Sequence, residues 1–254
     1  MRGARNNKGQ VTIFIILAIV IVVLGVIIYA FLPQIRSTIG SELQSPQVYL
    51  QSCLEDEIED AVYDLSLQGG SLNPEFYYLY DESKLQYLCY TSENYEFCNP
   101  QVPFLKKSVE KEIKDSISAD ANECLNSLEQ TYKRKGYDTQ LKKGSLEVEL
   151  LPQRVLVTLN SELTLKKKSS ESYEKFNIIL DNNIYELVSL SASVVEKEAS
   201  QGEVDILIYM MAYPKYKLEK LEQSDGTRVY IFTERNKENK FQFAVRSMAF
   251  PPGY

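Results

Sequence analysis

The sequence predicts an α+β protein in which a single N-terminal transmembrane helix precedes an extracytoplasmic domain of about three helices and antiparallel β-strands. Three observations lead to this fold class. The segment 11–32 is apolar and uncharged. Several later segments repeat apolar residues every three or four positions, as amphipathic helices do. Others alternate apolar and polar residues between turn-forming residues, which is typical of half-buried strands.

The apolar segment runs from Val11 to Leu32 and contains 22 residues, 17 of which are Val, Ile, Leu or Phe. As a helix it would be about 33 Å long, close to the ~30 Å hydrocarbon core of a bilayer. Arg2, Arg5 and Lys8 precede it, with no acidic residue among them. The positive-inside rule therefore predicts a single-pass protein of the cell membrane, with a cytoplasmic N-terminus and an extracytoplasmic C-terminal domain. The lipid bilayer is the first predicted partner.

Changes in composition divide the chain into six parts. Two prolines, a glycine and several small polar residues follow the apolar segment, which indicates a stalk or a frayed extension of the membrane helix. The predicted parts are a basic leader (1–9), a transmembrane helix (10–32), a stalk or linker (33–47), a helix–β-hairpin–helix region with four Cys (48–135), a β-rich region with one helix (136–250) and a tail (251–254).

Helical periodicity predicts three helices outside the membrane. Apolar residues recur at helical steps over 48–68, and Gly69-Gly70 provides a stop signal. A second helix is expected from Leu105 to about Lys135, after two prolines that break the chain. A third helix is expected over 183–199.

Alternation and turn residues predict the strands. A hairpin with a four-residue connection is expected from the aromatic segments 76–80 and 85–90, and a second hairpin turns at Asp225-Gly226. The remaining predicted strands are 145–151, 154–160, 162–168, 215–223, 228–234 and 241–250.

The four cysteines, an even number in an extracytoplasmic domain, favour two disulfides, for which three connectivities exist. Cys89 and Cys98 flank a short segment, which suggests a local bridge, and Cys53 and Cys124 would then join two helices. The longer bridge should stabilise the fold by about 4 kcal/mol through loop entropy. Four reduced, buried thiols are the alternative. A Cys₄ zinc site is disfavoured because no C-x₂-C pair is present.

Composition excludes several functional classes. The chain contains no His, which excludes Ser-His-Asp and Cys-His nucleophiles and His-ligated zinc. The net charge of −7 argues against nucleic acid as a partner. We find no Gly-rich phosphate loop and no acidic pair at a diagnostic spacing, so the sequence predicts no enzyme, no cofactor and no metal site.

The leader Lys8-Gly9-Gln10 and the apolar segment behind it resemble the class III signal peptides of archaeal type IV pilins and archaellins. The resemblance implies that a prepilin-type peptidase cuts between Gly9 and Gln10 and that the retained helix can pair with other subunits in a homo- or hetero-oligomer. Many pilins carry Glu at the fifth mature position, where this chain has Phe14, which places filament assembly in doubt. An uncleaved signal anchor is the alternative.

A wider resemblance adds the helix around Cys53-Leu54, which ends in Gln68-Gly69-Gly70. With the leader, it looks like a group of uncharacterised membrane-anchored proteins of small-genome archaea. This resemblance implies location and architecture and assigns no activity.

Two functions follow as expectations. The first is a non-enzymatic, pilin-like cell-surface protein with a structural, adhesive or envelope role. The alternative is a membrane-tethered binding module for a ligand or partner protein, which a deep apolar pocket in the folded domain would favour. Two lysine clusters, 142–143 and 166–168, could contact acidic polymers or lipid head groups, although solvated strand ends are the commoner explanation of such clusters.

Overall fold

The structure is a computed structural model that describes residues 20–21, 44–235 and 239–251. Pro46–Tyr254 forms one compact unit, and the elements discussed below all belong to it. Within the described ranges, no helix combines the length and the apolar character that crossing a bilayer requires.

Several sequence-based predictions concern residues outside this description. They are the leader (1–9) with the processing site at Gly9 and Gln10, the membrane helix (10–32) from Val11 to Leu32 except for Val20 and Ile21, most of the stalk (33–47) and all but the first residue of the tail (251–254).

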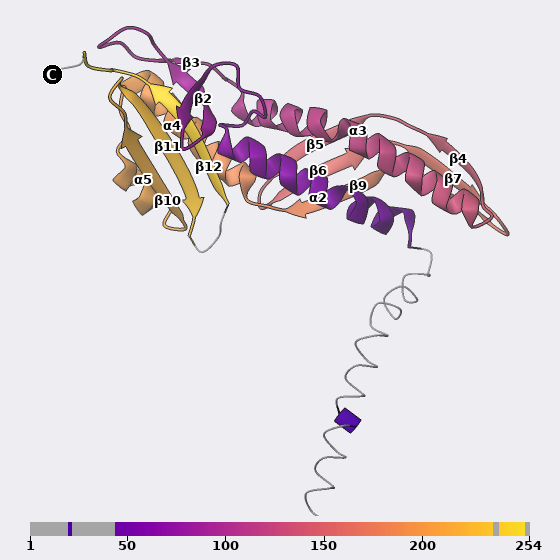
Figure 1. The fold of residues 1–254 in the computed structure, drawn as a ribbon. Helices are drawn as coiled ribbons and strands as arrows, with labels where there is room; N and C mark the ends of the chain where they lie inside the picture. The colour runs from indigo at the N-terminus through magenta and orange to yellow at the C-terminus, as the bar shows by residue number, and fades with distance from the viewer. Residues whose placement is uncertain (1–19, 22–43, 236–238, 252–254) are drawn as a thin grey trace, which may run out of the picture. The chain divides into compact units, whose positions relative to one another are not determined.

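The described residues form an α+β fold with four helices and antiparallel-rich sheets (Figure 1), as the sequence predicts for the fold class. The helices are α2 (Pro46–Leu67), α3 (Leu105–Arg134), α4 (Ile184–Gln201) and α5 (Ile206–Ala212). The strands are β1 (Tyr77–Tyr80), β2 (Ser83–Tyr90), β3 (Asn99–Pro100), β4 (Asp138–Lys142), β5 (Leu146–Leu151), β6 (Arg154–Leu159), β7 (Glu162–Lys166), β8 (Ser170–Tyr173), β9 (Phe176–Asp181), β10 (Tyr216–Glu222), β11 (Thr227–Glu234) and β12 (Lys240–Arg246).

Helices α2 and α3 form an antiparallel pair along the unit (Figure 1). Gly70, just after α2, lies against Val109 near the start of α3, and the Cys53–Cys124 disulfide joins the other halves with 6.1 Å between the Cα atoms. Each fully buried Leu, Ile or Val contributes about 1.5–3 kcal/mol of transfer free energy. The fully buried apolar residues of the pair include Leu50, Leu54, Ile58, Leu65, Val109, Ile113, Ile117 and Leu128.

The helix pair packs on a long ribbon of two three-stranded antiparallel sheets, β5-β6-β9 and β4-β7-β8. Strand β4 leads directly into β5, β6 into β7, and β8 into β9, so each strand of one sheet continues into the other after a short break. At one break, a Cβ on Gly144 would lie 1.7 Å from the carbonyl oxygen of Asn160. No side chain fits at this position, because the two backbones need that close approach.

Side chains from the helices close both outer edges of the β5-β6-β9 sheet. Gln51 of α2 accepts the Ile179 N–H at 3.0 Å and donates to the Ile179 carbonyl at 2.9 Å, and Gln47 makes the same pair of bonds with Asn177. On the opposite edge, Glu110 of α3 accepts a backbone N–H of β5 at 2.9 Å. These contacts satisfy backbone groups that would otherwise be open to pairing with another chain.

The third sheet has the order β1-β2-β12-β11-β10, with β3 paired to β2. The β2–β12 pair is parallel and the other neighbours are antiparallel. This pair places a strand from the predicted region 48–135 beside one from the region 136–250, so both regions share a sheet. Helix α4 packs against this sheet through contacts with β2, β11 and β12.

The three helices that the sequence predicts are present, and their ends differ from the prediction by at most two residues. The prediction of about three helices omits α5, because its apolar residues follow no helical stripe and none of them is buried. Strands β4 and β8 were also missed, because their sequences DTQLK and SESY contain too few apolar residues to show alternation. The burial of strand β9 alternates, but its sequence FNIILD does not, because the exposed position 179 carries Ile, and the strand was therefore missed as well.

The predicted four-residue connection of the first hairpin is wrong. Tyr80 pairs with Ser83, so only Asp81 and Glu82 form the turn. Both residues have positive φ, 46° and 64°, as a two-residue hairpin turn of this twist requires. The sequence hides this turn, because such positions usually carry Gly or Asn.

Candidate functional site

A groove lies between α4 and the segment that connects β3 to α3. Its volume is 630 Å³, within the range of ligand pockets, which is roughly 300–1,000 Å³. Its lining residues are Leu88, Pro100, Val102, Pro103, Leu105, Ser189, Ala192, Ser193, Val195, Glu196, Ala199 and Ser200.

The face of α4 that lines the groove carries mostly small side chains, so it fills little of the space beside the helix. The buried face of α4 packs on the sheet, while the outward face carries residues spaced three or four positions apart, which align along one side of a helix. Apart from Glu196, the lining residues of this face are Ser or Ala: Ser189, Ala192, Ser193, Ala199 and Ser200.

The opposite wall is a non-helical segment with two prolines. Pro100 and Pro103 disfavour a helix before Leu105, and the chain bends at Gln101 and turns at Pro103 and Phe104 before α3 begins. Leu88, Leu105 and Val195, each at most 7 % exposed, form the apolar base of the groove. Small residues on one wall and a non-helical segment on the other leave the space between them open.

Few polar groups of the groove remain available to a ligand. Ser189 and Ser200 donate their hydroxyl protons to carbonyl oxygens one turn earlier in α4. The Ser193 hydroxyl lies 2.8 Å from the Tyr209 hydroxyl of α5, and burial raises the pKa of Tyr209, so this phenol stays neutral. The carboxylate of Glu196 is exposed at the rim. The groove therefore offers apolar contact with one negative charge.

One exposed apolar side chain adjoins the groove directly. Phe104, beside Pro103, is 73 % exposed. Helix α5, whose Tyr209 contacts Ser193, also exposes Leu207 and Met211, but these residues lie two positions from Tyr209 and therefore on the other side of the helix.

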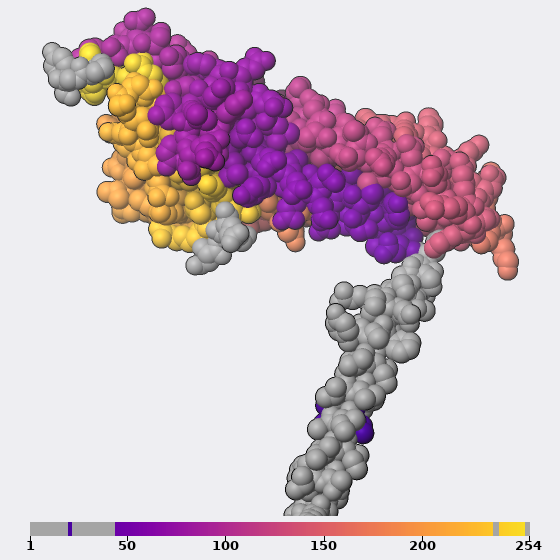
Figure 2. All heavy atoms as spheres, viewed as in Figure 1, coloured from indigo at the N-terminus to yellow at the C-terminus, as the bar shows by residue number. Residues whose placement is uncertain are grey.

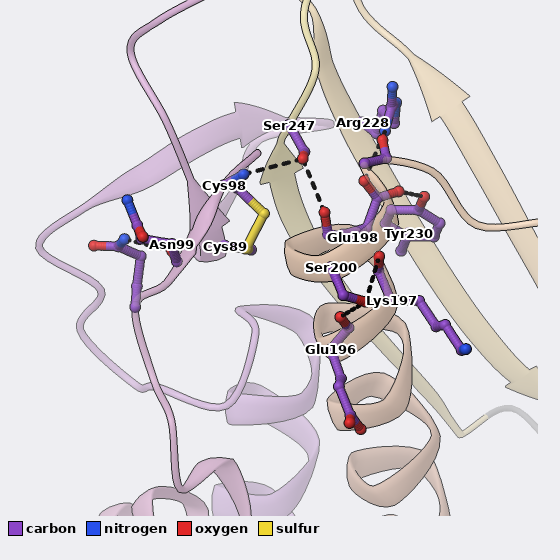
Figure 3. Close-up of a disulfide and its surroundings, with 12 residues drawn as sticks. Cys89, Cys98, Asn99, Glu196, Lys197, Glu198, Ser200, Arg228, Tyr230 and Ser247 are labelled. Carbon is purple, nitrogen blue, oxygen red and sulfur yellow. Dashed lines mark hydrogen bonds and ion pairs between the residues drawn. A yellow bond between two sulfur atoms is a disulfide. The ribbon is translucent and has the colours of Figure 1, made fainter. Parts of the chain in front are cut away.

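A hydrogen-bonded chain holds the two groove walls together (Figure 3). The Cys89–Cys98 disulfide fixes the start of the β3 segment to β2, and the Cys98 N–H donates to the Ser247 hydroxyl at 3.1 Å. That hydroxyl donates in turn to the backbone carbonyl of Glu198 on α4, at 3.0 Å. The disulfide thereby positions one wall relative to the other.

A buried ion pair fastens α4 to the sheet beneath the groove (Figure 3). Glu198 is fully buried, and its carboxylate lies 2.7 Å from the Arg228 guanidinium and accepts a hydrogen bond from the Tyr230 hydroxyl. Burial raises the pKa of Glu198, although the Tyr230 hydrogen bond and the Arg228 charge lower it in part. Burial and the nearby carboxylate also raise the pKa of Tyr230. The Glu198 carboxylate is closed to solvent and Arg228 is only 9 % exposed, and we assign this cluster a role in positioning α4.

The residues that the sequence singled out are distributed as follows. Both predicted disulfides, Cys53–Cys124 and Cys89–Cys98, are present, and no described cysteine is free. The two lysine clusters are exposed and lie at opposite ends of β7. Within the described ranges, no group of three or more Cys, Asp and Glu side chains is arranged to hold a metal ion.

Sequence reasoning missed the groove residues. The signal available was the spacing of Ser and Ala along 189–200, which leaves one face of a helix without large side chains. That pattern shows that one helix face has small side chains, but it does not show that the segment between β3 and α3 lies opposite this face. Comparisons of the chain with protein-family models, curated proteins and solved structures find no match. The functional proposal for the chain therefore rests on the geometry of the groove.

Proposed function

We propose that this chain is a membrane-tethered, extracytoplasmic binding protein whose groove receives an apolar or amphipathic segment of a partner. The groove of 630 Å³ with its apolar base is the observation that carries this proposal. The exposed Phe104 supports it, because this side chain adjoins the Pro103 wall and extends the apolar surface beyond the groove. A partner with a positive charge near one end would also meet Glu196.

The tether is supported by the uncharged segment Val11 to Leu32 and the basic leader before it. A non-enzymatic role is supported by the lining of the groove. Its serine hydroxyls are bonded to helix carbonyls or to Tyr209 and face no base, and the sequence contains no His. Binding is therefore the activity that these residues support.

Photo-crosslinking from the groove tests the binding function. A benzophenone side chain in place of Ala192 in the full-length chain should yield a discrete adduct in the producing cells. The matched position is Ala119, an exposed alanine of α3 away from the groove, which should yield none. Adding Ala199→Arg to the groove should lower the adduct yield roughly tenfold, because losing about 55 Å² of apolar contact at about 25 cal/mol per Å² weakens binding by about 1.4 kcal/mol. The same adducts from both positions would contradict the proposal.

A pilin-like structural role is the second candidate, and the Lys8-Gly9-Gln10 leader favours it. If a class III peptidase processes the chain, mass spectrometry should find a mature N-terminus at Gln10, and replacing Gly9 by Leu should block the cut. A mature chain that begins at Met1 or Arg2 would contradict pilin-type processing and leave the tethered binding function in place.

A further inference from the structure

We infer that one end of the described unit is a docking surface for an anionic phospholipid membrane. This surface, the basic tip, consists of Lys133, Arg134 and Lys135 at the end of α3 and of Lys166, Lys167 and Lys168 at the β7–β8 turn. All six side chains belong to exposed residues.

Direct contacts bring the two halves of the basic tip together. The Lys167 ammonium donates to the carbonyl oxygen of Lys135 at 2.8 Å and lies 4.8 Å from the centre of the Tyr137 ring. Strand pairing sets Lys166 opposite Asp138, the first residue of β4 after α3 ends. Two segments about 30 residues apart in the chain therefore present their charges on one surface.

The charge of the basic tip is opposite to that of the chain as a whole. The chain has 28 Lys and Arg against 35 Asp and Glu. At the tip, six cations lie beside the carboxylates of Glu129, Asp138 and Glu171, and Glu129 is paired with Lys133 at 2.8 Å. A local excess of Lys and Arg on an acidic protein is complementary to an anionic surface. Where the facing leaflet, here the extracytoplasmic one, contains anionic lipids, each such residue contributes about 1 kcal/mol.

Chain connectivity keeps this end of the unit within reach of the predicted bilayer. Because α2 and α3 are antiparallel, α2 begins beside the end of α3, and Figure 2 shows the β7–β8 turn projecting at the end where the indigo atoms of α2 begin. The predicted membrane helix ends at Leu32, and residues 33–45 span at most about 45 Å when fully extended. The end of the unit closest to the tether is thus the one that carries the cations. The Tyr137 ring beside them is of the type that favours membrane interfaces.

The inference rests on the membrane tether of the proposed function, and it predicts that docking depends on lipid charge. The full-length chain is incorporated into nanodiscs, with a donor fluorophore on a non-natural residue at Ser169 and an acceptor on the lipid head groups. Energy transfer should be higher in phosphatidylglycerol than in phosphatidylcholine and should fall when NaCl is raised from about 0.1 M to 0.5 M, because exposed charges are screened. The triple variant K166S/K167S/K168S should shift the ratio of docked to undocked protein roughly 100-fold toward the undocked form.

The control variant K84S/K107S/K114S removes the same number of exposed lysines elsewhere and should leave the energy transfer unchanged. Equal transfer in the two lipids, or equal losses in the two triple variants, would overturn the inference. Binding of a soluble acidic polysaccharide to the tip, together with equal energy transfer in the two lipids, would also overturn it, since the tip would then serve that polymer. If the chain fails to enter the discs, the predicted membrane tether is wrong. Cosedimentation with phosphatidylglycerol vesicles then tests the inference. The tip variant should pellet less than the control variant, and equal pelleting would overturn the inference.

Discussion

Replacing Arg228 by Met is expected to lower the free energy of unfolding by about 3–5 kcal/mol. The substitution leaves the Glu198 carboxylate fully buried without the guanidinium that lies 2.7 Å away. It also removes the hydrogen bond from Arg228 to the carbonyl oxygen of Gly202, at the end of α4. Urea unfolding followed by circular dichroism at pH 7 measures the change.

The double variant Arg228→Met with Glu198→Gln provides the control. A neutral amide in place of the stranded carboxylate should recover a large part of the loss, because the uncompensated charge is then absent. Arg246→Met is a comparison variant, since the Arg246 guanidinium lies on a partly exposed surface. A loss below about 1 kcal/mol in Arg228→Met, or no recovery in the double variant, would contradict the importance of this pair.

The pH dependence of the Arg228→Met variant follows from the pKa of Glu198. Burial raises this pKa above the ordinary value of 4.5, and removing the Arg228 charge takes away one of the influences that lower it. The native state then binds the proton more tightly than the unfolded state does. The contribution of Glu198 to the free energy of unfolding is therefore complete below about pH 4.5 and is lost as the pH rises through the pKa of Glu198 in the native state. The difference between variant and parent should grow from pH 4.5 toward pH 7.

Removing the Cys53–Cys124 disulfide is expected to have the second large effect. Its partners are 71 residues apart, against 9 for Cys89–Cys98. Loop-closure entropy then gives about 4.4 kcal/mol for the long bridge and about 2.6 kcal/mol for the short one. Urea unfolding should therefore show a larger loss of unfolding free energy in Cys53→Ser with Cys124→Ser than in Cys89→Ser with Cys98→Ser. Equal losses or the reverse order would contradict the entropic account.

The two disulfides should differ in function in the opposite sense. The short bridge positions the β3 wall of the groove through the Cys98 N–H and Ser247, whereas the long one joins α2 and α3. The pair Cys89→Ser and Cys98→Ser should therefore reduce groove crosslinking from position 192, while Cys53→Ser with Cys124→Ser should preserve it at temperatures where the domain stays folded. Reduced crosslinking in the long-bridge variant alone would contradict the role assigned to the short bridge.

The elements that the sequence predicts well are those whose signal is local. The stripe of α2 repeats within one segment, and Gly69-Gly70 ends it, so the prediction 48–68 matches the observed Pro46–Leu67 closely. The observed disulfide pairing was the favoured one of three, because Cys89 and Cys98 flank a short segment and leave Cys53 and Cys124 to join the two helices. Neither inference needs knowledge of which strands pair.

The groove could not be predicted, because its two walls are about 90 residues apart in the chain. The spacing of Ala192 and Ala199 shows that one face of α4 has small side chains, but only the path of the segment around Pro103 leaves space opposite it. The Glu198–Arg228 pair was also missed. Glu198 continues the buried stripe of α4 after Val194 and Val195, which indicates burial, but nothing in the sequence shows that Arg228 lies opposite it. The neighbours that decide these features lie in other elements.

The sequence by itself determined the positions of three helices and the α+β class, because hydrophobic periodicity acts over short stretches of chain. It favoured the observed cysteine pairing but left the three connectivities open. Only the tertiary structure decided that β2 pairs in parallel with β12, that β7 leaves the sheet of β6, and that α4 faces an open groove. Strand pairing and groove formation depend on contacts between segments far apart in the chain, and many partners satisfy the same local pattern until packing selects one.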